Sequence, residues 1–85
     1  MISCQLALYP LATKEFAKVI VEALKALEPL QKEGLIIEVG SMSTVIKGKD
    51  DLVWKAVRLL FEEAAKDGQQ IVLTASISNE CGCDL

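Results

Sequence analysis

The order in which the hydrophobic spacing changes along this chain constrains its fold more than any other feature. Hydrophobic residues first alternate with polar ones, then recur at helical spacing, and then alternate in two neighbouring segments. A second segment with helical spacing and one more alternating segment follow. Alternation indicates a β-strand, and spacing of three or four residues indicates an amphipathic helix. The pattern therefore predicts the order β-α-β-β-α-β. The expected segments are 2–8, 16–27, 35–39, 44–47, 53–64 and 71–78.

Residues that favour helix ends flank both helical segments. Thr13 and Asp50 are candidate N-caps, because their side-chain oxygens can accept hydrogen bonds from backbone amides of the first turn. Pro29 lacks a backbone N–H and should stop or kink the first helix. Gly34 and Gly68 suit the positions that follow a helix C-terminus.

Two helices, each with one apolar stripe, can cover one face of a four-stranded sheet. With right-handed crossovers, this order gives an α+β, ferredoxin-like βαββαβ arrangement with an antiparallel sheet. The first and third strands are then central, and the second and fourth are edges. A chain of 85 residues has room for one core, so we expect residues 1–85 to form a single domain.

The two faces of the expected sheet differ in character. We expect the helices to cover one set of residues: Ile2, Cys4, Leu6, Leu8, Leu35, Ile37, Val39, Val45, Leu73, Ala75 and Ile77. The open face would then carry Ser3, Gln5, Ala7, Tyr9, Ile36, Glu38, Thr44, Ile46, Val72, Thr74, Ser76 and Ser78. Small hydroxyl groups with few charges suit a surface that a partner subunit buries. Ordinary decoration of solvent-facing strands with Ser and Thr is the alternative.

A candidate binding site follows from the polar residues of this open face. We expect the hairpin turn at the end of the sheet where the first strand starts and the fourth ends. A glutamine there offers a donor and an acceptor, and a carboxylate can face an amine or a cation. This set suits a small amine-bearing heterocycle and lacks equipment for bond breaking. The members of this set are Gln5, Glu38, Ser41, Ser43, Thr44 and Ser76. Alternatively, the charge of Glu38 only protects an edge strand from pairing with other chains and aggregating.

Charge and composition exclude several classes of function. Nine Lys and Arg against twelve Asp and Glu give a net charge of −3, which disfavours nucleic acid as a partner. The chain has no histidine, which excludes histidine-dependent nucleophile pairs and zinc motifs and lowers the expectation of an enzyme. We therefore expect no catalytic residues, no cofactor and no metal. Because 52% of the residues are hydrophobic, we expect a homo-oligomer, a dimer or a tetramer.

Three cysteines are an odd and sparse count, which does not indicate a secreted disulfide framework. Cys4 belongs to the expected core face, where a free cysteine acts as a small hydrophobe. Cys81 and Cys83 could bind a soft metal with Cys4, form a redox-labile pair, or have no role. The N-terminal residues lack the basic stretch of a signal peptide, and no apolar run is long enough to span a bilayer. The sequence thus predicts a cytoplasmic protein without membrane insertion.

Other features carry weaker alternatives. The segment 40–43 could present backbone amides to a phosphate, but its composition favours an ordinary hairpin turn. Trp54 lies on or beside the second helical stripe, which favours burial in the core or in an interface. An RNA-recognition module of this topology would need stacking aromatic residues on its central strands, and Tyr9 is alone there.

Three segments together resemble the thiamine- and hydroxymethylpyrimidine-binding YkoF-like family of small ferredoxin-like proteins. They are 3–11, 77–79 and the most specific one, 38–48, which reads E-V-G-x-x-x-T-x-I-x-G. The resemblance implies a thiamine-binding-like domain that forms dimers or tetramers. It also implies non-catalytic binding of thiamine or its hydroxymethylpyrimidine moiety in salvage, transport or sensing of vitamin B1 precursors. By this resemblance, Gln5 and the turn from Gly40 to Thr44 would hold the aminopyrimidine.

Two other classes of function stay open at this point. A structural or regulatory oligomerisation module of ferredoxin-like fold would assemble without affinity for pyrimidines. An enzyme would have Glu38 as its one credible acid–base group, with no partnered nucleophile.

Overall fold

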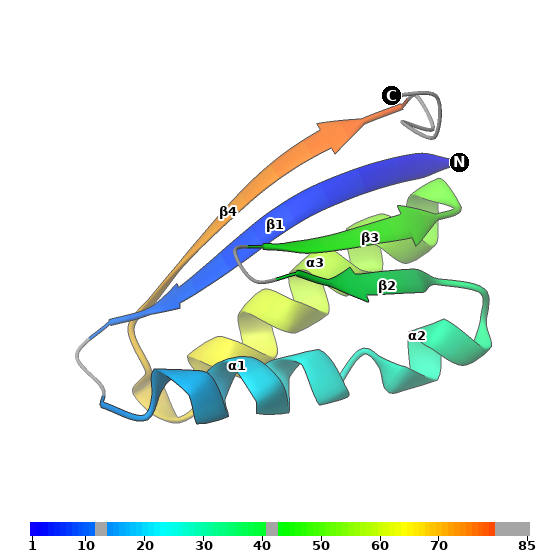
Figure 1. Ribbon diagram of the computed structural model, residues 1–85. Coiled ribbons are helices and arrows are strands. Elements are labelled where there is room, and N and C mark those ends of the chain that lie inside the picture. Colours follow the sequence, from blue (N-terminus) through cyan, green and yellow to red (C-terminus); the bar gives the residue numbers. More distant parts are fainter. Residues whose placement is uncertain (12–13, 41–42, 80–85) are drawn as a thin grey trace.

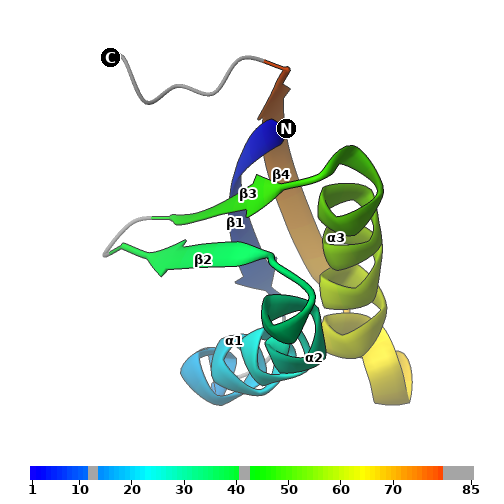
Figure 2. The same cartoon turned by 90° about the vertical axis from the view of Figure 1, so that its right-hand side faces the viewer.

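The computed structural model describes residues 1–11, 14–40 and 43–79. Four strands form one twisted sheet, and the helices lie together on one of its faces (Figures 1 and 2). This is the predicted α+β, ferredoxin-like arrangement. The elements in chain order are β1 (Ile2–Pro10), α1 (Phe16–Lys25), α2 (Glu28–Lys32), β2 (Ile36–Val39), β3 (Thr44–Gly48), α3 (Asp50–Ala65), the 3₁₀ turn η1 (Lys66–Gly68) and β4 (Ile71–Ser78).

The strand order is β2-β3-β1-β4, and every neighbouring pair is antiparallel. The prediction that β1 and β3 are central and β2 and β4 are edges is therefore confirmed. Pairing of β1 with β3 runs from Ile2 opposite Gly48 to Leu6 opposite Thr44. Because β3 runs antiparallel to β1, the hairpin turn lies beside the middle of β1. The prediction that the turn lies where β1 starts and β4 ends was wrong.

The first helical segment is divided in two near its proline. Helix α1 ends at Lys25, and Pro29 lies in the first turn of the short helix α2, where a missing N–H costs no hydrogen bond. Gly34 then adopts a φ of 112°, a conformation that favours glycine, before the chain enters β2. The break that Pro29 predicted is thus confirmed.

The predicted N-caps have a different outcome. Helix α3 has Lys49 at its N-cap, so the prediction for Asp50 was wrong by one residue. Asp50 and Asp51 instead occupy the first turn, where the helix dipole favours negative charge. Thr13 lies outside the described residues.

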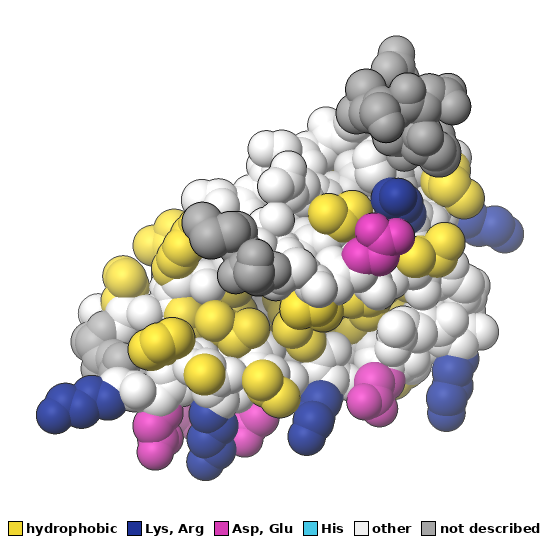
Figure 3. All heavy atoms as spheres, viewed as in Figure 1, with side chains coloured by type: hydrophobic (Ala, Val, Ile, Leu, Met, Phe, Trp, Pro, Cys, Tyr) yellow, Lys and Arg dark blue, Asp and Glu magenta, His cyan; other side chains and the backbone are white. Residues whose placement is uncertain are grey.

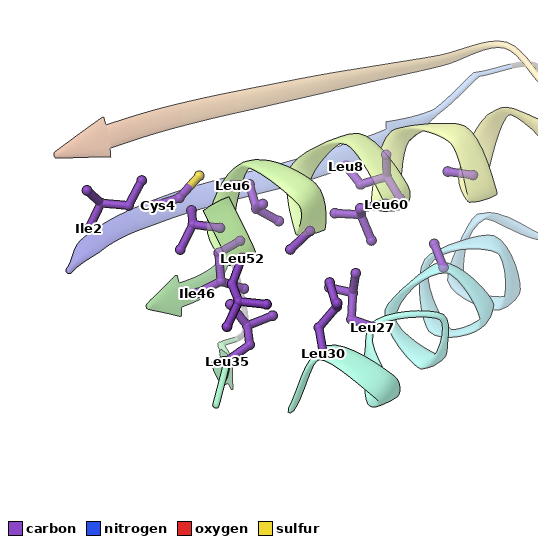
Figure 4. Packing of buried hydrophobic residues seen from close by; sticks show 14 residues of the cluster. Ile2, Cys4, Leu6, Leu8, Leu27, Leu30, Leu35, Ile46, Leu52 and Leu60 are labelled. Atoms are coloured by element: carbon purple, nitrogen blue, oxygen red, sulfur yellow. The ribbon is translucent and has the colours of Figure 1, made fainter. Parts of the chain in front are cut away.

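The core lies between the helices and one face of the sheet (Figure 4). Strand β1 contributes alternate side chains, and among them Cys4 is almost fully buried, as predicted. From the helix layer, Leu27, between α1 and α2, and Leu60 of α3 are almost fully buried in the core. Figure 4 shows these side chains directed into the space between the two layers.

The faces of β3 are the reverse of the sequence prediction. Ile46 is fully buried opposite Cys4 and Ile37, and Thr44 is 8% exposed opposite Leu6. Both side chains therefore point beneath the helices, and Val45 lies on the open face instead. Alternation could not decide this point, because the segment has apolar residues at both parities.

Several large apolar side chains are not covered by the described residues. Trp54 and Phe61 on α3 are 56% and 46% exposed, and Phe16 at the start of α1 is also exposed. The prediction that Trp54 enters the core was wrong, whereas burial in an interface stays a prediction. None of the helices among the described residues is long and apolar enough to cross a membrane.

Candidate functional site

One row of side chains crosses the whole open face of the sheet. Gln5 of β1 lies opposite Val45 of β3 and opposite Ser76 of β4, and Val45 lies opposite Glu38 of β2. Residues opposite one another on antiparallel strands point to the same face, with Cβ atoms about 4.5–5.5 Å apart. Pairing therefore brings together three predicted site residues, Gln5, Glu38 and Ser76, with the glutamine near the centre.

Two adjoining hollows lie over this row. One has a volume of about 360 Å³ and is lined by Ser3, Cys4, Gln5, Glu38, Val45, Lys47, Ser76, Ile77 and Ser78. The other has a volume of about 280 Å³ and is lined by Gln5, Leu6, Ala7, Tyr9, Ser43, Thr74 and Ser76. Gln5 and Ser76 line both hollows, which we together call the open-face trough. The trough has a charged end beside β2 and an aromatic end at Tyr9.

Gln5 is held in place by the hairpin. Its Nε2 donates a hydrogen bond of 3.1 Å to the Oγ of Ser43, which immediately precedes β3. The amide nitrogen has a second hydrogen, and Oε1 has two lone pairs. The Gln5 side chain can therefore still donate and accept hydrogen bonds while the bond to Ser43 limits its orientation.

A charged pair closes the β2 end of the trough. The Nζ of Lys47 lies 3.9 Å from Oε1 of Glu38, with the lysine side chain 26% exposed and the glutamate side chain 62% exposed. They are the two charged side chains on the open face of the described strands, and Figure 3 shows one pair of opposite charges amid mostly uncharged groups. A pair this exposed contributes little to stability, about 0–1 kcal/mol. Both charges are therefore available to a ligand.

A third hollow lies on the other side of the hairpin, toward the helices. This hairpin groove has a volume of about 140 Å³ and is mainly apolar, with Ile20 and Leu24 of α1 facing β1 and the hairpin. Gly40 and Thr44 line it together with Val39 and Ser43. The N–H of Gly40 donates a 2.8 Å hydrogen bond to the Ser43 carbonyl. A Cβ on Gly40 would lie 3.0 Å from that oxygen, which explains the glycine.

The predicted site residues are therefore divided between the two faces of the sheet. Gln5, Glu38 and Ser76 line the open-face trough, Ser43 lines both the trough and the groove, and Gly40 and Thr44 line the groove alone. Ser41 lies outside the described residues. The prediction placed Thr44 beside Gln5 because it assigned the wrong face to β3.

Five polar residues of the trough were absent from the predicted site. Alternation had placed four of them on the open face: Ser3, Tyr9, Thr74 and Ser78. The fifth, Lys47, follows from alternation once Val45 is known to face outward. The signal for all five was therefore present in the strand periodicity.

The described residues offer little of the machinery for metal binding or nucleophilic catalysis. They contain no group of three or more His, Cys, Asp or Glu side chains that could hold a metal ion. Burial raises the pKa of the Cys4 thiol, which keeps it protonated and a poor nucleophile at neutral pH. Cys81 and Cys83, whose role the sequence left open, lie outside the described residues.

Comparison with known proteins gives a family and a set of similar folds. The model of the YKOF-related family matches residues 1–84. No curated protein matches the sequence. Solved structures that resemble the chain include a Streptococcus pneumoniae protein at 20% identity, with a TM-score of 0.80 over 93% of this chain and 86% of that one.

Two further structures are similar to a comparable extent. A Bacillus cereus protein described as the domain of unknown function DUF77 is 21% identical, with a TM-score of 0.76 over 93% of this chain and 75% of its own. A Thermotoga maritima protein, described as a candidate for thiamine biosynthesis or salvage, is 20% identical, with a TM-score of 0.74 over 95% and 85%. At these identities the likeness establishes a shared fold.

Proposed function

Since this chain belongs to the YKOF-related family, we propose that it binds thiamine or its hydroxymethylpyrimidine moiety in the open-face trough, without catalysis. A thiamine-related role is supported by the family and by the description of the Thermotoga maritima neighbour. The observation that carries the proposal is the position of Gln5, which Ser43 holds at the centre of a mostly uncharged trough. Residues 1–85 act in this proposal as one thiamine-binding domain.

The trough complements an aminopyrimidine. Such a ring presents an exocyclic amine that donates and ring nitrogens that accept hydrogen bonds. The Gln5 amide can accept from the amine and donate to a ring nitrogen in one plane, and the Ser76 hydroxyl can do either. Each of the two hollows is close to the lower end of the range of about 300–1,000 Å³ that is typical of small-molecule sites.

The two ends of the trough suit the rest of thiamine. Its thiazolium ring has a positive charge, and the Glu38 carboxylate can neutralise that charge at the β2 end. Tyr9 at the other end is 53% exposed and offers a flat ring for stacking. A second copy over the open face would exclude water from these contacts and strengthen them.

Binding is a better use of this trough than turnover. The chain has no histidine, and Glu38, the carboxylate that lines the described trough, lies beside the cation of Lys47. Salvage, transport or sensing of vitamin B1 precursors each require reversible capture of the ligand. All three are compatible with a site that holds a ring by hydrogen bonds.

Calorimetric titration with thiamine and with hydroxymethylpyrimidine tests the proposal. We expect binding by the wild type and, for Gln5→Ala, a loss of about 5- to 150-fold in affinity, as expected for about 1–3 kcal/mol of hydrogen bonding. Gln31→Ala, an exposed glutamine on α2, is the matched control and should bind normally. Absence of heat at millimolar ligand, or equal affinity of Gln5→Ala and Gln31→Ala, would contradict the proposal.

A second variant locates the ligand with respect to the sheet. Thr44→Val keeps the shape of the buried side chain and removes the hydroxyl group that the hairpin groove contains. A ligand in the open-face trough should tolerate this change. A loss of affinity in Thr44→Val with normal affinity in Gln5→Ala would move the site to the hairpin groove.

The second candidate function is a structural or regulatory oligomerisation module. The exposed apolar side chains of α3 favour it, because such residues mark interaction surfaces. This function predicts self-assembly together with no binding of either pyrimidine ligand in the titration above.

A further inference from the structure

A second row of side chains crosses the open face beside the row that contains Gln5. Lys47 of β3 lies opposite Ile36 of β2 and opposite Ser3 of β1. Ser3 in turn lies opposite Ser78 of β4. Lys47, Ser3 and Ser78 all line the larger hollow of the open-face trough. This row therefore brings one cation and two hydroxyl groups to a part of the trough that the aminopyrimidine ring itself does not require.

The ammonium group of Lys47 is not committed to its neighbouring carboxylate. Its Nζ lies 3.9 Å from Oε1 of Glu38, which is beyond the range of about 2.7–3.2 Å for N–H···O hydrogen bonds. An ammonium group has three N–H donors, and none of them is used by Glu38 at this distance. The pair is held by charge alone, so Lys47 can donate hydrogen bonds to a ligand.

A cation beside hydroxyl groups suits a single phosphate group. Lysine binds phosphate as a point charge, and a hydroxyl group can donate a hydrogen bond to a phosphate oxygen. Glu38 is on β2, whereas Ser3 lies on the opposite side of β3, on β1. A phosphate between Lys47 and Ser3 would therefore lie on the side of the lysine that faces away from the carboxylate.

The register places this row within reach of a ring held at Gln5. Gln5 lies opposite Val45, and Lys47 follows Val45 by two residues on the same face, so Gln5 and Lys47 are diagonal neighbours. Such neighbours are about 7–8 Å apart. A phosphate on the hydroxymethyl oxygen of hydroxymethylpyrimidine is separated from the ring by only one carbon and one oxygen. A ring at Gln5 can thus place this phosphate beside Lys47 without leaving the trough.

We propose that the open-face trough binds the monophosphate ester of hydroxymethylpyrimidine in preference to the free alcohol, with Lys47, Ser3 and Ser78 holding the phosphate. This inference rests on the proposed function, because it requires the ring to be held at Gln5. Lys47 then determines which member of the ligand class is retained, because its charge attracts the phosphate ester and repels the thiazolium ring of thiamine.

A phosphate monoester fits this site better than a polyphosphate or a free phosphate ion. The chain has a net charge of −3, and Lys47 is the one cation on the open face of the described strands, so a run of phosphates would meet mainly repulsion. Inorganic phosphate can contact Lys47 but makes no use of Gln5. The ester joins ring and phosphate in one molecule, so it should bind more tightly than either part.

Calorimetric titration with hydroxymethylpyrimidine, its monophosphate ester and inorganic phosphate tests this inference. The wild type should bind the ester about 10-fold more tightly than the free alcohol, as expected for a hydrogen bond to a charged group. Inorganic phosphate should bind at least about 10-fold more weakly than the ester. Added salt should weaken binding of the ester and have little effect on the uncharged alcohol.

Variants of Lys47 assign the preference to one side chain. Lys47→Gln should lower the affinity for the ester about 10-fold, so that the ester and the free alcohol bind equally. Lys47→Arg keeps the positive charge and should retain the preference. Lys55→Gln, at an exposed lysine of α3 in the helix layer, removes the same charge from the chain and is the matched control. Tighter binding of thiamine by Lys47→Gln would show that this variant is folded.

Three results would overturn the inference and leave the proposed function intact. They are equal affinities of the wild type for the ester and the free alcohol, equal losses of ester affinity in Lys47→Gln and Lys55→Gln, and equal affinities for the ester and inorganic phosphate. If neither hydroxymethylpyrimidine nor its ester binds, the proposed function fails and this inference fails with it.

Discussion

The two faces of the sheet differ most clearly at two neighbouring residues of β1. Cys4 points beneath the helices and is almost fully buried, whereas Gln5 points outward into the open-face trough. Alternation along one strand thus assigns packing to one face and hydrogen bonding to the other. The comparison teaches that changes on the two faces should affect different properties, stability on the covered face and ligand capture on the open one.

The largest expected effect comes from truncating a residue of the covered face. Ile46→Ala should lower the free energy of unfolding by about 2–5 kcal/mol, because it leaves a cavity where Ile46 packs between the layers. Val45→Ala, one residue earlier and on the open face, should cost less than about 1 kcal/mol. Urea denaturation of both variants measures the difference, and equal costs would contradict the assignment of faces in β3.

A smaller effect concerns the pH dependence of stability at the covered face. Burial raises the pKa of Cys4 in the folded state, so above about pH 8.5 the unfolded chain releases this proton before the folded chain does. The free energy of unfolding should therefore fall with rising pH, by at most about 1.4 kcal/mol per pH unit from this group. The contribution is fully present below the unfolded pKa and is lost through the folded pKa.

Comparing the wild type with Cys4→Ala between pH 7 and 10 isolates this contribution, because every other titrating group is common to both. The wild type should lose more stability over this range. Parallel pH curves for the two proteins would show that the Cys4 thiol ionises equally in the folded and unfolded states.

The smallest effect is expected at the charged end of the open face. Lys47→Gln removes the cation that lies 3.9 Å from Glu38 and should change stability by less than about 1 kcal/mol. If Glu38 faces the thiazolium ring, the variant should bind thiamine about 2- to 5-fold more tightly at low salt, since a few tenths to 1 kcal/mol is typical of exposed charges. Titration with uncharged hydroxymethylpyrimidine is the control and should give unchanged affinity.

The element order and the sheet order could be predicted from the sequence because they depend on periodicity and handedness. The segments 2–8 and 71–78 alternate without ambiguity, and the helical stripes fix both crossovers. The N-cap of α3 could not be predicted, because it is Lys49, and the lysine side chain has no oxygen that could accept a hydrogen bond from the first turn.

The candidate site was predictable in part. Gln5, Glu38 and Ser76 were predicted to lie together, and their strand pairing brings them into one row. Thr44 was assigned to the wrong face because Val45 and Ile46 are both apolar. Alternation within this strand alone therefore could not show which residues face the helices. The information lay in the neighbouring strands, where Cys4 and Ile37 face the helices unambiguously and Ile46 lies opposite both.

The position of β1 has a consequence for how the protein is made. This strand leaves the ribosome before the other three, yet it lies inside the sheet, and its longest pairing is with β4, about seventy residues later. Contacts so distant along the chain slow folding, because a large loop must close before they form. Until the residues of β4 have been synthesised, one side of β1 has no neighbouring strand, so the nascent chain can misassemble on that side until β4 emerges.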